Sequence, residues 1–105
     1  METSAERLTR LAKIMAQELV DRPEEVLVTS VAGEYSLIIE INTHPTDVGK
    51  LIGKMGVNAD AMREILTAVG CKLHISVVLE IIDPFSSRHD TVRVYRRTPF
   101  RRRGT

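Results

Sequence analysis

Aromatic residues are scarce in this 105-residue chain, which has two Tyr, two Phe and no Trp, so its core must be aliphatic. The single cysteine, Cys71, excludes an internal disulfide and has no second Cys at metal-ligand spacing. No apolar run approaches the roughly eighteen residues that span a bilayer, and no early stretch has signal-peptide chemistry. We therefore expect one cytoplasmic domain that makes no membrane contact.

Residues that could carry catalysis are also few. His44, His74, His89 and Cys71 form no spacing typical of a triad or a metal cluster, and the glycine pair at Gly53 and Gly56 is too close for a Walker loop. The sequence predicts no enzyme activity, no catalytic or metal-binding residue, no cofactor and no small-molecule substrate. We interpret Cys71 as a small buried hydrophobe.

Charge is divided unevenly along the chain. From Met1 to Ser87 there are eight Lys and Arg against thirteen Asp and Glu, a net of minus five; Arg88 to Thr105 holds seven Arg and one Asp, a net of plus six. Because polyanions are attracted by local basic clusters, the near-neutral total hides a basic tail over residues 85–105.

Hydrophobic periodicity predicts the order helix, strand, strand, helix, loop, helix, strand. The first helix covers about Glu6–Val20, with Thr3 or Ser4 as its cap and Pro23 beyond its end. The remaining elements are strands at 26–31 and 35–42, a helix at 45–52, a helix from Val57 that ends at Gly70 as a left-handed cap, and a strand at 73–82. Thr91 to Tyr95 alternates enough for a short extra strand.

A right-handed strand-helix-helix-strand crossover makes two of these strands parallel, so the sheet is mixed. We expect an α+β fold with a three-stranded mixed sheet and three helices on one face, in the order α-β-β-α-α-β. Ile38, Val78 and Ile82 then lie on the opposite face. They indicate either a contact with another subunit or with the tail, or ordinary scattered surface hydrophobes.

The run Gly53-Lys54-Met55-Gly56 lies between two predicted helices. Glycines three apart permit a tight turn and leave no Cβ between the peptide groups and a ligand, so amides and a lysine can reach a phosphate. The amino terminus of the following helix adds a partial positive charge. The alternative is a plain helix-loop-helix connection, which the spacing alone favours.

The surrounding residues favour the first interpretation. Leu51-Ile52-Gly53-Lys54-Met55-Gly56, with Asp47-Val48-Gly49-Lys50 before it, resembles the KH-domain signature, Ile-Gly-x-x-Gly with a basic residue in the loop. Over roughly residues 7–83 the order of elements is similar to that of the small bacterial single-KH RNA-binding proteins of the KhpA family. The resemblance implies a type II KH domain at residues 1–84, followed by the arginine-rich tail at 85–105.

The resemblance also implies a site for single-stranded RNA and a function as a small RNA chaperone or post-transcriptional regulator. By position, Gly53, Lys54, Met55 and Gly56 approach phosphate and sugar, Ile52 helps floor an apolar groove beside the sheet, and Lys50 adds longer-range attraction. The chain departs from many relatives at Val57, where they carry a basic residue, and Asp60 adds a negative charge nearby.

The tail has two interpretations. Arg96, Arg97, Arg101, Arg102 and Arg103, interleaved with Tyr95 and Phe100, suit phosphate contacts and stacking on unpaired bases, or else form a flexible solubilising end.

The family is associated with self-pairing and with a larger KH-containing RNA-binding partner. A homodimer or such a heterodimer is therefore expected. The competing function is a protein-interaction or dimerisation module with little intrinsic RNA affinity.

Overall fold

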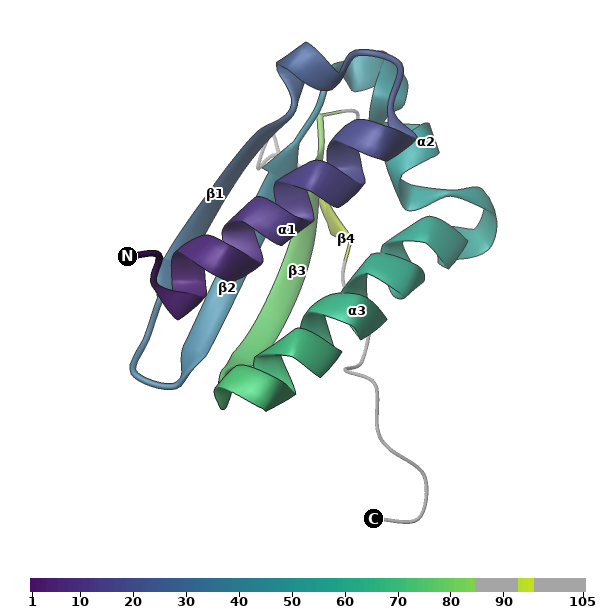
Figure 1. Ribbon diagram of the computed structural model, residues 1–105. Coiled ribbons are helices and arrows are strands. Elements are labelled where there is room, and N and C mark those ends of the chain that lie inside the picture. The colour runs from purple at the N-terminus through teal and green to yellow at the C-terminus, as the bar shows by residue number, and fades with distance from the viewer. Residues whose placement is uncertain (85–92, 96–105) are drawn as a thin grey trace.

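The computed structural model describes residues 1–84 and 93–95, and within them four strands form one sheet in the order β1-β2-β3-β4 (Figure 1). The helices are α1 (Ser4–Leu19), α2 (Val48–Ile52) and α3 (Val57–Leu73), and the strands are β1 (Leu27–Ala32), β2 (Ser36–Asn42), β3 (Ser76–Asp83) and β4 (Arg93–Tyr95). Short 3-10 turns at Pro23–Glu25, Pro45–Asp47 and Lys54–Gly56 join them.

The sheet is mixed, as predicted. β1 pairs antiparallel with β2, β2 pairs parallel with β3, and β4 adds an antiparallel edge strand in register with Ile81, Ile82 and Asp83. Helices α1 and α3 lie over one face of this sheet (Figure 1). The predicted α+β class is therefore confirmed. Of the extra strand predicted at Thr91–Tyr95, Arg93–Tyr95 forms β4, and the first two residues lie outside the described residues.

An aliphatic core fills the space between the sheet and the helices. Alternate residues of the strands point into it, with Leu37, Ile39 and Ile41 from β2 and Leu79 and Ile81 from β3 all at most 1% exposed. Burying each such side chain contributes roughly 1.5–3 kcal/mol. On α1 the inward positions are Leu8, Ala12 and Ala16, and the small side chains of the two alanines let the helix approach the sheet closely.

A capping box begins α1. The Thr3 hydroxyl oxygen accepts from the Glu6 N–H at 3.1 Å, and the Glu6 carboxylate accepts from the Thr3 N–H at 2.8 Å. Thr3, one of the two predicted candidates, is therefore the cap, and the helix ends at Leu19, before Pro23.

The predicted end of the third helix was wrong. Helix α3 continues through Gly70 to Leu73, and His74, with φ of 62°, is the left-handed cap rather than a strand residue. Gly70 is instead a point of close approach, because a Cβ there would lie 2.5 Å from the Ile75 carbonyl oxygen. Cys71, predicted to be buried, is exposed.

Two glycine-to-alanine substitutions test this assignment. Gly70→Ala is expected to lower the free energy of unfolding by about 2 kcal/mol, because the new methyl group meets the Ile75 carbonyl and Val77. Gly49→Ala in α2 is the matched control, since nothing lies within 4 Å of its added Cβ. It should stabilise the protein by about 0.5 kcal/mol, because alanine lowers the conformational entropy of the unfolded chain. Urea unfolding measures both, and a neutral Gly70→Ala would contradict the close approach.

Candidate functional site

A tight turn connects α2 to α3, and three of its four residues have positive φ. Gly53 has φ 80° and ψ 167°, Met55 has φ 56° and ψ 24°, and Gly56 has φ 80° and ψ 14°. The conformation of Gly53 is one that only glycine adopts without strain. The two glycines therefore let α2 stop and α3 start within four residues.

Asn58, in the first turn of α3, holds this turn in place. Its side-chain amide donates to the Lys50 carbonyl at 2.9 Å, and its Cγ lies 2.7 Å from where a Cβ on Gly53 would be. Asn58 was not among the residues predicted for the site, because its role depends on where the Lys50 carbonyl at the end of α2 lies in space. An amide residue shortly after a glycine pair is the one signal that could have pointed to it.

The N–H groups of the two glycines are already used inside the turn. Gly53 donates to the Gly49 carbonyl at 2.8 Å and Gly56 donates to the Gly53 carbonyl at 3.0 Å. Among the described residues, the backbone hydrogen bonds that lie outside the helices and strands include none from the N–H groups of Lys54 or Met55. The glycines therefore set the shape of the turn, and the two residues between them carry the candidate donors to a ligand.

The same two residues are exposed at the surface. Met55 is 90% exposed and Lys54 is exposed, whereas Gly56 is buried. The amino terminus of the 17-residue α3 follows directly at Val57, so its partial positive charge lies next to the turn that carries Lys54. An ammonium group, two N–H donors and a helix amino terminus together suit an anionic group.

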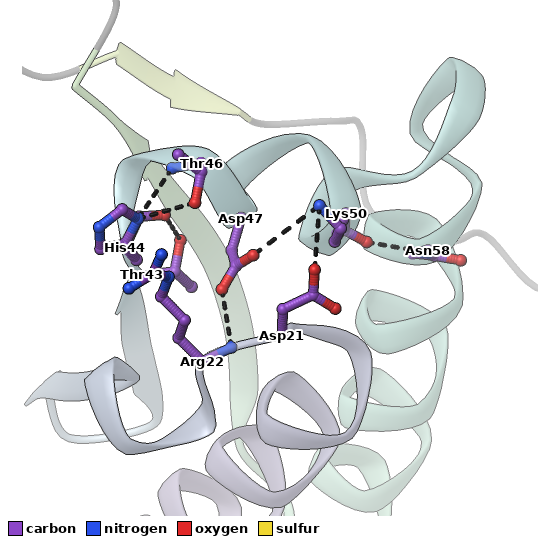
Figure 2. A network of polar contacts seen from close by, with 8 residues as sticks. All are labelled: Asp21, Arg22, Thr43, His44, Thr46, Asp47, Lys50 and Asn58. Carbon is purple, nitrogen blue, oxygen red and sulfur yellow. Dashed lines mark hydrogen bonds and ion pairs between the residues drawn. The ribbon is translucent and has the colours of Figure 1, made fainter.

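Lys50 lies in a polar network rather than alone (Figure 2). Its ammonium nitrogen is 3.3 Å from a carboxylate oxygen of Asp21, at the end of α1, and 4.0 Å from one of Asp47. Asp47 is only 1% exposed, and its second oxygen accepts from the Arg22 N–H at 3.0 Å. These carboxylates offset the charge of Lys50, so Lys54 is the stronger attraction for an anion.

The network also fixes the start of α2. His44 accepts from the Thr46 N–H at 3.2 Å through its ring nitrogen, and Thr43 donates to the His44 carbonyl at 3.1 Å (Figure 2). Asp47 then ties this 3-10 turn to the segment after α1. The backbone before the exposed turn is thereby held on both sides.

The negative charge of Asp60 is offset within α3. A carboxylate oxygen of Asp60 lies 3.3 Å from the Arg63 guanidinium, and Arg63 is 6% exposed. The same guanidinium donates to the Leu79 carbonyl of β3 at 3.4 Å. Asp60 therefore adds less negative charge to the turn than its position in the sequence implies.

An apolar groove of about 250 Å³ lies between α1 and α3. Its lining includes Met15, Leu19, Ala61, Met62 and Ile65, and Asn58 is at the end nearest the turn. Ile52, predicted to help floor an apolar groove beside the sheet, is partly buried against the core, and it does not line this separate groove between the two helices. A second hollow lies between α1 and β1, over Ala5, Thr9, Val28 and Ser30.

The remaining predictions concern the tail, metal ions and the membrane. The tail residues Arg96, Arg97, Arg101, Arg102 and Arg103 lie outside the described residues. Within the described ranges, no group of three or more His, Cys, Asp or Glu could hold a metal ion. No helix of that part of the chain is long and apolar enough to cross a membrane.

Comparison with known proteins decides the family. The family described as "KhpA/KhpB, KH domain" matches residues 9–81. This chain belongs to the KhpA/KhpB KH-domain family. The predicted family resemblance is therefore confirmed.

Individual relatives agree with this assignment. The RNA-binding protein KhpA of Aquifex aeolicus is 45% identical over 76 residues, which cover 72% of this chain and 96% of that protein. The RNA-binding protein KhpA of Clostridium perfringens is 45% identical over 75 residues, covering 71% and 100%. That of Chlamydia pneumoniae is 40% identical over 67 residues, covering 64% and 86%. No solved structure matches the chain significantly.

The buried carboxylate of Asp47 can be tested against the exposed one of Asp21, since both face Lys50. Asp47→Ala is expected to lower the free energy of unfolding by about 2 kcal/mol, because it leaves the Arg22 N–H without its acceptor. Asp21→Ala should cost less than about 0.5 kcal/mol, as expected for an exposed ion pair. Equal effects in thermal unfolding would contradict the proposed role of Asp47.

Proposed function

We propose that this protein binds single-stranded RNA through the turn Gly53–Gly56, and that it acts in the cytoplasm as a small RNA chaperone or post-transcriptional regulator. The observation that supports this most is the exposure of Lys54 and Met55 in a turn whose two glycine N–H groups are already used internally. Relatives that match along nearly their whole length are named RNA-binding proteins.

One phosphate of the RNA strand lies against the turn in this proposal. The N–H groups of Lys54 and Met55 donate to its oxygens, the Lys54 ammonium offsets its charge, and the α3 amino terminus adds a favourable dipole. The glycines allow the sugar-phosphate backbone to approach without a Cβ in the way. Such contacts position the strand but carry no sequence information.

Affinity through this turn alone should be weak, because few phosphates are neutralised. Lys54 is the principal cation, since the charge of Lys50 is offset by Asp21 and Asp47. We propose that Arg96, Arg97, Arg101, Arg102 and Arg103 of the tail add phosphate contacts and make binding steeply dependent on salt. Bases then lie beside Ile52, as the KH resemblance implies.

Binding, rather than catalysis, is the proposed activity. Single-stranded RNA is the proposed ligand, with no cofactor or small-molecule substrate.

Substitution of the turn tests this function directly. Lys54→Asp with Met55→Asp is expected to weaken binding of a short single-stranded RNA at least about tenfold, because an ammonium is lost and two carboxylates face the phosphate. Lys13→Asp with Ile14→Asp is the matched control, since it changes the charge equally at an exposed lysine and an exposed apolar residue on α1. Fluorescence anisotropy measures both. Equal affinities of the two variants would contradict the proposal.

A second candidate function is supported by the groove between α1 and α3. Its lining is almost wholly apolar, and Ile65 is 47% exposed there. We propose that this groove is a contact with a second KH-containing subunit, either another copy of this chain or a larger RNA-binding protein. RNA binding and pairing are compatible, because Lys54 and Met55 do not line the groove.

A charge placed in this groove tests whether the groove is a contact between subunits. Ile65→Asp should convert a dimer to a monomer in light scattering, because a carboxylate in an apolar contact is not solvated. Val31→Asp is the control, since Val31 is exposed on the opposite face of the sheet. Dissociation by Val31→Asp but not by Ile65→Asp would assign the contact to the sheet instead. RNA affinity of both variants shows whether assembly and binding are separable.

A further inference from the structure

The sheet face turned away from the helices carries two carboxylates in adjacent positions. Glu40 of β2 and Glu80 of β3 are register partners, and both alternate with residues that are buried beneath the helices. Neighbouring strands lie about 4.8 Å apart, so the two side chains start close together. Like charges in such positions repel, which makes this face favourable for a cation.

Glu80 is enclosed although it lies on this outer face. It is only 6% exposed, whereas Ile38, in the next row of the same face, is 38% exposed. The Thr29 hydroxyl approaches the Glu40 carboxylate at 3.5 Å from the other side. An enclosed carboxylate is stable when it is paired with a cation and hydrogen-bonded.

The chain leaves β4 close to the Glu40–Glu80 pair, and the residues that follow are rich in arginine. Strand β4 lies beside β3 (Figure 1) and runs antiparallel to it. Its last residue, Tyr95, is the register partner of Ile81. Arg96 follows Tyr95 in the chain, and Glu80 precedes Ile81 on β3. If the antiparallel register continued by one residue, Arg96, at the start of the arginine-rich segment, would pair with Glu80.

Charge and length also fit this segment to the face. Residues 1–87 carry a net charge of minus five and residues 88–105 carry plus six. The ten residues 96–105 span up to about 33 Å when extended. The sheet from β4 to β1 is about 15 Å wide, so this segment is long enough to cross the face.

We propose that the outer face of the sheet is the docking surface of the chain's own segment 96–105, with Arg96 and Arg97 against the carboxylates of Glu40 and Glu80. The arginines that the proposed function assigns to RNA are then held on the protein until RNA competes for them. This second step rests on the proposed function, whereas the docking itself does not.

A double-mutant cycle without RNA tests the docking. In urea unfolding at low salt, Glu80→Gln should lower the folding equilibrium constant about fivefold in the otherwise unchanged chain, and less than about twofold when Arg96→Gln and Arg97→Gln are present. The control, Arg101→Gln with Arg102→Gln and Arg103→Gln, should keep most of the fivefold effect. Additive effects of Glu80→Gln and the Arg96, Arg97 substitutions would overturn the proposal. So would coupling that depends on protein concentration, which would place another copy's tail on the face.

RNA binding tests the competition separately. Glu40→Gln with Glu80→Gln should raise the affinity of the full chain for single-stranded RNA about threefold, because the arginines no longer leave a carboxylate partner. The gain should vanish when Arg96→Gln and Arg97→Gln are also present. Unchanged affinity would overturn the competition, whereas absence of RNA binding by every variant would overturn the proposed function and leave the result of the cycle intact.

Discussion

The left-handed backbone of the turn between α2 and α3 is the constraint on which the candidate site depends. Gly53 and Gly56 have φ of 80°, and Met55 accepts a positive φ between them. Asn58 closes the space beside Gly53 and binds the Lys50 carbonyl, so the turn cannot relax without losing that hydrogen bond. Because the glycine N–H groups are used internally, the proposed contact with RNA is made by Lys54 and Met55. Within this motif, the glycines fix the backbone conformation, and the two residues between them make the proposed contact.

Polar contacts behind the turn define which charges are available to a ligand. Asp47 joins the segment after α1 to the start of α2 and, with Asp21, holds Lys50 (Figure 2). Arg63 does the same for Asp60 within α3. The domain therefore has an exposed cation at Lys54 although its net charge is negative, which favours weak, salt-sensitive contact with a polyanion. Asn58 also reaches the groove between α1 and α3, so a partner docked in that groove would touch the residue that supports the turn.

Much of the fold could be predicted from the sequence, because its elements are set by local periodicity. Alternation in β2 and β3 gave the correct buried faces, and the parallel crossover followed from chain order. Gly70 was mistaken for a cap. Glycine is needed there because the Ile75 carbonyl lies too close for a Cβ, and this close approach arises only when β3 packs back on α3. The motif located the turn, but the ion pairs of Lys50, the packing of Ile52 and the role of Asn58 depend on contacts between segments distant in sequence. The tail arginines remain a prediction.

A nuclear magnetic resonance titration of the protein with a short single-stranded RNA tests the central claim most directly. The account predicts that the backbone amides of Lys54 and Met55 show the largest shifts, because their N–H groups bind phosphate, and that the amides of Gly53 and Gly56 shift less. Amides lining the groove between α1 and α3 should change little, apart from Asn58. The largest shifts at Met15, Ala61 and Ile65, with Lys54 and Met55 unchanged, would contradict it.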